Sequence, residues 1–148
     1  MSKIILRPEL PGIKQIASGK VREIYQAGDN LVFVSSDRLS AFDVIMNQGI
    51  PFKGNVLNKI SEFWFGMVED IVPTHFISSK IEDYPDEFHR FRQELEGRSM
   101  LVKKGKIIPI ECIVRGYLSG SGWNDYLAEG GTSGIMLNEG MLESEKLH

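Results

Sequence analysis

Short runs in which apolar and polar residues alternate predict a small antiparallel sheet near the start of the chain. Three such runs follow one another, and turn sequences rich in Gly, Ser, Asp and Asn separate them at residues 18–19 and 28–30. Turns of this composition connect neighbouring antiparallel strands. We therefore expect a β-meander made of residues 13–19, 21–28 and 31–36.

Apolar residues that recur every three or four positions between residues 55 and 71 predict the longest helix of the chain. Asn55 stands just ahead of the periodic residues, where its side chain can serve as the N-cap. The helix carries the aromatic cluster Phe63, Trp64 and Phe65. We expect these three side chains in the core.

Residues 85–96 predict a second, weaker helix. Pro85 can occupy its first turn and Gly97 can end it. The side chains expected on its buried face are Phe88, Phe91 and Leu95.

Two further apolar runs, residues 99–104 and 107–118, predict strands joined across Gly105, as a hairpin or as a hinge between two lobes. Residues 123–129 predict a short helix. Strands connected by short turns, mixed with separate helices, are typical of the α+β class.

Composition narrows the class of protein. The chain has 148 residues, 42% of them apolar and 25% charged, which excludes a disordered or collagen-like chain. The formal net charge of −3 argues against a nucleic-acid binder. No apolar run approaches the roughly 20 residues of a membrane span. A single cysteine excludes an internal disulfide and a cysteine-based zinc cluster. We expect a soluble, cytoplasmic protein.

The first chemical candidate is the sequence Gly19-Lys20-Val21-Arg22 between two predicted strands. A glycine lets the backbone approach a ligand closely, and cations two residues apart share one face of a strand. Lys20 and Arg22 would suit a polyphosphate, although the spacing is not that of a Walker A loop. The alternative is a solvated strand with two surface cations.

The second candidate is the loop expected at residues 36–43, directly after the third predicted strand. Its hydroxyls and carboxylates belong to Ser36, Asp37, Ser40 and Asp43. Arg38 lies among them and could clamp a carboxylate or phosphate through two parallel hydrogen bonds. The alternative is a capped turn with an internal Asp–Arg pair.

The third candidate lies on the last predicted strand, where Glu111, Ile113 and Arg115 share one face by alternation. After it, the hydroxyls of Ser119 and Ser121 and the amides at the start of the predicted helix could bind an anion. A buried structural salt bridge followed by a glycine turn is the alternative. The three isolated histidines do not have the spacing of a metal site, and we expect none.

Four segments in this order resemble the family of SAICAR synthetase, or phosphoribosylaminoimidazole-succinocarboxamide synthase. They are GKVREIY at 19–25, SDRLSAFD at 36–43, GIPFKGNVLNKISEFWF at 49–65 and MLVKKGKIIPIECIVRGYLSGSGW at 100–123. The last of these segments is specific to the family.

The resemblance implies a ligase of purine biosynthesis that uses ATP and Mg²⁺. Its reaction joins the carboxylate of carboxyaminoimidazole ribonucleotide to the amine of L-aspartate, through an acyl phosphate. The implied fold is related to ATP-grasp and kinase-like architectures. It comprises a small ATP-binding, β-rich lobe with helices over residues 1–104 and the start of a larger α/β substrate lobe over residues 105–148. The enzyme could be a homo-oligomer.

The resemblance also implies roles for residues, although it identifies no catalytic group. Lys20 and Arg22 would lie over the ATP phosphates, and the adenine would lie near the segment from Lys103 to Ile107. Arg115 and Ser121 would hold the ribonucleotide. The residues expected to border the ribonucleotide and aspartate sites are Asp37, Arg38, Ser40 and Asp43.

Family members continue into a DxKxEFG stretch and an acidic loop, both associated with ATP and Mg²⁺, and neither occurs here. We expect a truncated chain whose metal ligands lie in the missing part, and which has no turnover alone. The alternative function is a non-catalytic module that binds nucleotides or anions on the same scaffold.

Overall fold

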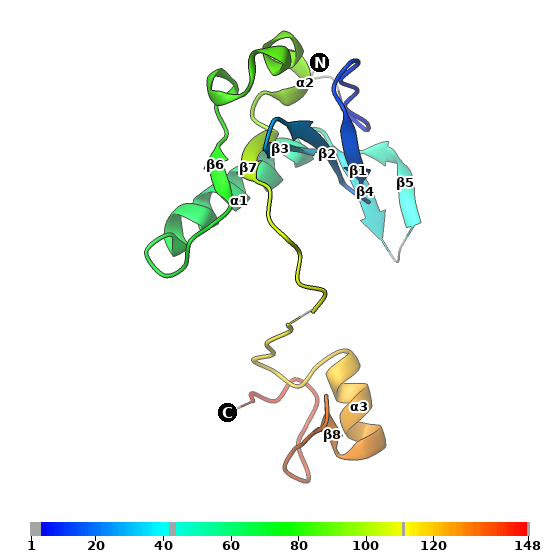
Figure 1. Cartoon of the computed structure of the whole chain (residues 1–148). Coiled ribbons are helices and arrows are strands. Elements are labelled where there is room, and N and C mark those ends of the chain that lie inside the picture. Colours follow the sequence, from blue (N-terminus) through cyan, green and yellow to red (C-terminus); the bar gives the residue numbers. More distant parts are fainter. Residues whose placement is uncertain (1–3, 42–43, 111, 148) are drawn as a thin grey trace. The chain divides into compact units, whose positions relative to one another are not determined.

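The computed structural model describes residues 4–41, 44–110 and 112–147. The chain divides into two units, Met1–Lys106 and Ile107–His148 (Figure 1). Both units combine helices with antiparallel strands, so the α+β class is confirmed. Within the described residues, no helix has the length and apolar character needed to cross a membrane.

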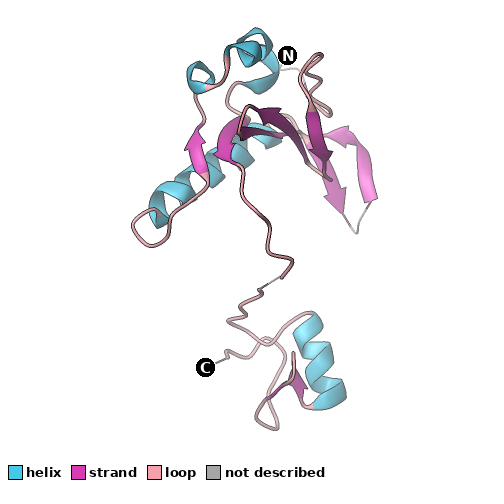
Figure 2. Cartoon of the chain, viewed as in Figure 1, coloured by secondary structure: helices cyan, strands magenta, loops and turns pink. Residues whose placement is uncertain are grey.

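An antiparallel five-stranded sheet organises the first unit (Figure 2). Its strands, in spatial order, are β1 (Gln15–Ser18), β2 (Arg22–Ala27), β3 (Asn30–Ser35), β7 (Ser99–Lys103) and β6 (Phe76–Ser78). The predicted meander is confirmed, because β1, β2 and β3 pair in sequence order. Gly28 occupies the turn between β2 and β3 with φ of 60°, a conformation that glycine adopts without strain.

The strands β4 (Arg38–Ala41) and β5 (Val44–Gly49) form a hairpin that is a separate two-stranded sheet. The interpretation of residues 36–43 as a loop was therefore wrong for residues 38–41. Hydrophobic alternation does not mark the hairpin, because β5 has no buried face: Val44 and Met46 are 62% and 44% exposed. Asp43 lies outside the described residues.

Helix α1 (Lys53–Val68) contacts β3 and β7. It begins two residues before the predicted N-cap, and Phe52, with φ of 62°, occupies the capping position without a side-chain hydrogen bond. The prediction that its aromatic cluster is core was wrong for Phe63 and Trp64, which are 60% and 57% exposed. Phe65 is half-buried, and its ring stacks on Phe76. The apolar stripe of α1 is therefore wider than the surface that it covers within this unit.

Three short helices complete the first unit: η1 (Ile81–Asp83), η2 (Asp86–Phe91) and α2 (Arg92–Leu95). The predicted single helix over 85–96 is thus a 3₁₀ segment followed by one α-helical turn. Its predicted buried side chains are confirmed. Phe88, Phe91 and Leu95 join the core with Tyr25, Val32, Val34 and Leu101 of the sheet.

The second unit contains α3 (Ser121–Glu129) and the small hairpin of β8 (Gly131–Thr132) and β9 (Ile135–Met136). The predicted strand over 107–118 was wrong, because none of its described residues belongs to a strand. Pro109 interrupts it, and Ile107, Ile108 and Ile110 are at least 72% exposed. A strand needs a partner for its ladder, and among the described residues of this segment only Tyr117 makes a β-bridge, an isolated one to Lys146.

Candidate functional site

The first candidate site is a tight turn between β1 and β2. The N–H of Gly19 donates to the carbonyl oxygen of Arg22 at 2.8 Å, so that Lys20 and Val21 form the tip of the turn. Lys20 therefore precedes β2, and the prediction that it shares a strand face with Arg22 was wrong. The side chains of Lys20 and Arg22 are both exposed.

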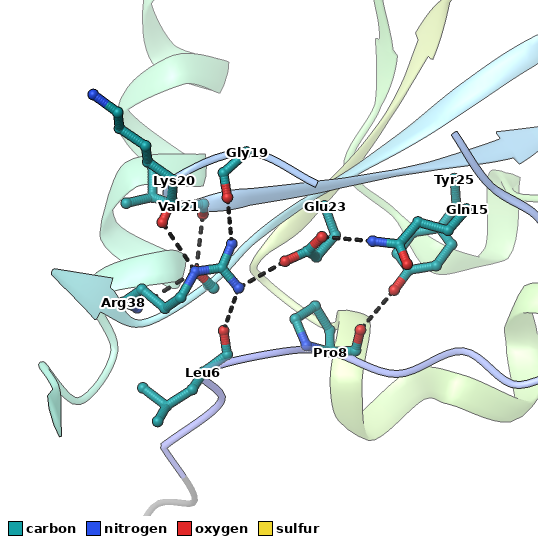
Figure 3. A network of polar contacts seen from close by, with 10 residues as sticks. Leu6, Pro8, Gln15, Gly19, Lys20, Val21, Glu23, Tyr25 and Arg38 are labelled. Atoms are coloured by element: carbon teal, nitrogen blue, oxygen red, sulfur yellow. Dashed lines mark hydrogen bonds and ion pairs between the residues drawn. The ribbon is translucent and has the colours of Figure 1, made fainter. Parts of the chain in front are cut away.

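Three consecutive carbonyl groups of this turn accept hydrogen bonds from the segment that follows β3 (Figure 3). Arg38 donates from Nη2 to the oxygen of Gly19 at 2.8 Å and from Nε to the oxygen of Lys20 at 2.9 Å. Ser36 donates its N–H and its hydroxyl to the oxygen of Val21, both at 2.9 Å. The backbone of the turn is thus held from inside the protein.

The remaining guanidinium nitrogen of Arg38 also has protein partners. Nη1 donates to the carbonyl oxygen of Leu6 and to Oε1 of Glu23, both at 2.6 Å. The side chains of Arg38 and Glu23 are only 5% and 3% exposed. Gln15 donates to the other carboxylate oxygen of Glu23 at 2.6 Å. Sequence reasoning missed Glu23, which lies on the buried face of β2 together with Tyr25 and Ala27.

Beside this network, the hydroxyl of Tyr25 donates to the carbonyl oxygen of Pro8 at 2.6 Å. Burial, followed by the negative charges of Glu23 and Glu9, raises the pKa of Tyr25 to about 12. Tyr25 therefore remains a neutral donor at physiological pH and ties the N-terminal segment to the sheet.

Asp37 is the centre of a second buried network of hydrogen bonds and an ion pair. Its Oδ1 accepts from the N–H of Gly54 at 2.9 Å, and its Oδ2 accepts from the N–H of Ile5 at 2.8 Å. Oδ2 also lies 3.0 Å from Nη1 of Arg98. Asp37 is fully buried. The internal Asp–Arg pair considered from the sequence is thus replaced by two pairs, Arg38 with Glu23 and Asp37 with Arg98.

The other predicted residues of the first unit are spread over several elements. Ser40 is half-buried in β4, opposite Ile45. Lys103 ends β7, and its N–H donates to the carbonyl oxygen of His75 at 2.7 Å. Ile107, which belongs to the second unit, is 88% exposed.

The other candidate site, which was the third candidate in the sequence, lies at the N-terminus of α3. Arg115 donates from Nη2 to the hydroxyl of Ser121 at 2.8 Å and from Nη1 to the carbonyl oxygen of Ser119 at 3.4 Å. A Cβ on Gly122 would lie 3.4 Å from Cδ of Arg115, an ordinary contact distance, so the Arg115 side chain packs against the first turn of α3. The structure thus brings Arg115 and Ser121 together, at a helix end that favours anions. Glu111 lies outside the described residues.

Among residues 4–41, 44–110 and 112–147, no group of three or more His, Cys, Asp or Glu side chains could hold a metal ion. This part of the chain therefore assembles no set of three such side chains for the Mg²⁺ that the family resemblance implies, although Mg²⁺ at an ATP site is commonly held by only one or two carboxylates together with the phosphates.

Comparison with known proteins gives a consistent result. The family model described as SAICAR synthetase matches residues 15–148. The phosphoribosylaminoimidazole-succinocarboxamide synthase of Geotalea uraniireducens (strain Rf4) is 56% identical over 147 residues, which are 99% of this chain and 50% of that protein. The corresponding protein of Geobacter metallireducens is 55% identical over the same shares.

Two solved structures share the fold. One, described as SAICAR synthase, superimposes with a TM-score of 0.89 at 40% identity, over 96% of this chain and 51% of that one. The other, described as SAICAR synthase from Saccharomyces cerevisiae complexed with SAICAR, gives a TM-score of 0.88 at 40% identity, over 96% and 50%. The chain spans about half the length of the curated relatives that it matches.

Proposed function

Because the chain belongs to the SAICAR synthetase family, we propose that it acts in the ATP-dependent synthesis of SAICAR, with ATP bound by its first unit and the ribonucleotide by its second. The main support is its likeness, at 40% identity, to a yeast chain described as complexed with SAICAR. The cytoplasm, where free thiols such as that of Cys112 persist, is the proposed location.

The proposed reaction is a C–N ligation. The carboxylate of carboxyaminoimidazole ribonucleotide accepts the γ-phosphoryl group of ATP, which gives an acyl phosphate and ADP. The amine of L-aspartate then attacks the acyl carbon, phosphate leaves, and an amide bond forms. The protein must hold two anionic substrates and ATP in line, so positioned cations account for much of its task.

In the first unit, we assign the ATP phosphates to the turn that carries Lys20 and to the neighbouring Arg22. Lys20 is at the tip of the turn and Arg22 starts β2, so Lys20 is the closer phosphate contact in this proposal. The segment from Lys103 to Ile107, whose last residue begins the second unit, is proposed to meet the adenine.

In the second unit, Arg115 and Ser121 are proposed to bind the ribonucleotide phosphate. Their contact of 2.8 Å and the amides at the start of α3 offer an anion both charge and hydrogen-bond donors.

Ser40 and Asp43, which belong to the first unit, are proposed to border the ribonucleotide and aspartate sites. Asp37 and Arg38 are buried, and we propose that they support these sites from inside rather than touch the substrates.

Calorimetric titration of ATP into the 148-residue chain tests the assignment. We expect Lys20→Ala to raise the dissociation constant by about tenfold to a hundredfold, the worth of one charge-assisted hydrogen bond. Arg22→Ala should raise it less, and neither variant should change the affinity for SAICAR. Equal, unshifted ATP affinities in both variants would remove the phosphate role from this turn.

A coupled assay of ADP release, run on the protein expressed from its native gene, distinguishes the ligase from the second candidate, a non-catalytic nucleotide-binding module. ADP release that requires both the ribonucleotide and aspartate supports the ligase. ATP binding without such release, in that protein supplied with Mg²⁺, supports the module.

A further inference from the structure

We propose that Arg38 is a positioning residue for ATP, which fixes the turn at Gly19–Val21 so that its backbone N–H groups face the phosphates. The inference rests on the proposed ATP role of this turn. Lys20 and Arg22, the exposed cations already assigned to this turn, would contact the phosphates directly. Arg38 is buried and would act on ATP only through the backbone of the turn.

The first step is the direction of the carbonyl groups. The oxygens of Gly19 and Lys20 both accept from the guanidinium of Arg38, at 2.8 and 2.9 Å. The next oxygen along the chain, that of Val21, accepts twice from Ser36. All three carbonyl groups therefore point toward the segment that follows β3 (Figure 3).

The second step follows from the planarity of the peptide bond. In a trans peptide the C=O of one residue and the N–H of the next point in opposite directions. No described peptide bond is cis. The N–H groups of Lys20 and Val21 are consequently directed away from Arg38. Successive N–H groups on one side of a turn form a concavity that binds anions, including phosphates.

The third step is the rigidity of Arg38 itself. Glu23 neutralises its charge at 2.6 Å, and Gln15 holds the second oxygen of that carboxylate. Leu6 supplies a further acceptor from the N-terminal segment. A guanidinium donates in a fixed planar fork, whereas the ammonium of lysine is a single point with three donors. Lysine could keep the ion pair with Glu23 but could not reproduce the bonds to both turn carbonyls.

The experiment compares Arg38→Lys with the wild-type chain and with Arg90→Lys. Arg90 is a matched control, because it also donates to a backbone carbonyl, that of Pro11, but away from the turn. Backbone ¹⁵N relaxation reports the order of residues 19–21 without nucleotide, and calorimetry reports the affinity for ATP. We expect Arg38→Lys to lower the order parameters of the turn from about 0.85 to below about 0.6, with those of β3 unchanged. We expect its ATP affinity to fall by about tenfold or more.

Each other outcome is decisive. A folded Arg38→Lys variant with an ordered turn overturns the proposal, as does a loosened turn with unchanged ATP affinity. A wild-type chain that binds no ATP refutes the proposed function, and the relaxation data then show separately whether Arg38 holds the turn. If Arg38→Lys does not fold, the double variant Glu23→Gln and Arg38→Met removes both buried charges at similar volume and is measured in the same way.

Discussion

Asp37 accepts a hydrogen bond from the N–H of Gly54 at 2.9 Å, and it thereby caps α1 from a strand connection 17 residues earlier in the chain. The same carboxylate accepts from the N–H of Ile5 and pairs with Arg98. A negative charge at a helix N-terminus is favourable because the unpaired N–H groups carry partial positive charge. One buried side chain therefore joins the N-terminal segment, α1 and the strand β7 that follows Arg98.

Removal of this carboxylate should destabilise the first unit strongly. We expect Asp37→Ala to lower the free energy of unfolding by about 3–5 kcal/mol, because it leaves Arg98 as an unpaired buried charge. Asp37→Asn should cost less, since its amide oxygen can still accept from Gly54. Urea unfolding followed by circular dichroism measures both. Equal losses in the two variants would mean that the ion pair, and not the cap, carries the whole effect.

Two glycines of α1 should respond to alanine in opposite directions. A Cβ on Gly54 would lie 2.4 Å from the carbonyl oxygen of Ser35, whereas nothing lies within 4 Å of a Cβ on Gly66. We expect Gly54→Ala to destabilise by about 1–3 kcal/mol through overpacking. Gly66→Ala should stabilise by up to about 1 kcal/mol, the difference in helix propensity. Thermal unfolding of the two variants gives the signs, and a stabilised Gly54→Ala variant would contradict the close approach of α1 to β3.

The exposed apolar face of α1 should bind a hydrophobic dye. We expect the double variant Phe63→Gln and Trp64→Gln to reduce anilinonaphthalene sulfonate fluorescence, because large apolar surfaces attract such probes. Its free energy of unfolding should change little, since both side chains are more than half exposed. Leu95→Ala is the control: Leu95 is fully buried, so its truncation should cost about 2–5 kcal/mol without lowering dye binding. Unchanged dye fluorescence in the double variant would place the dye site elsewhere.

Alkaline pH should destabilise the first unit through Tyr25 and Tyr84. Burial is the main cause that raises the pKa of both phenols to about 12, above their ordinary value of 10.0. The folded state therefore holds these protons more tightly than the unfolded state. The contribution of the two phenols to the free energy of unfolding is complete below about pH 10 and is lost as the pH rises toward 12. Urea unfolding across this range should show a shallower loss of stability in a variant with both Tyr25→Phe and Tyr84→Phe. If stability fell with pH just as steeply in this variant as in the wild-type chain, the two tyrosines would not be the cause of the alkaline destabilisation.

Arg115→Lys should weaken binding of SAICAR. An ammonium cannot donate in the geometry of the guanidinium fork, so we expect a loss of about tenfold to a hundredfold in affinity. Calorimetry of the chain with SAICAR measures the loss, and Lys20→Ala, in the first unit, serves as a variant whose SAICAR affinity should not change. Unchanged affinity together with a lower melting temperature would show that Arg115 only supports the start of α3.

The local elements of the first unit could be predicted because short-range rules determine them. Glycine-containing turns and alternation set the meander, and a three-to-four spacing placed Phe88, Phe91 and Leu95 on one buried face. The same rules proved wrong over residues 107–118, where the apolar character is present but no described residue belongs to a strand. A strand depends on a partner that its own sequence does not contain.

The sequence by itself determined the family, the meander and the types of charged groups present. Only the tertiary structure decided which charges face inward and what they hold. Arg38 reads as a substrate clamp in the sequence, but it is buried against Glu23 and the backbone of the turn. The physical reason is that a charge can be buried only with a partner close in space, and Glu23 comes from a different strand, 15 residues earlier. Such pairings depend on how distant segments pack, which no local pattern encodes.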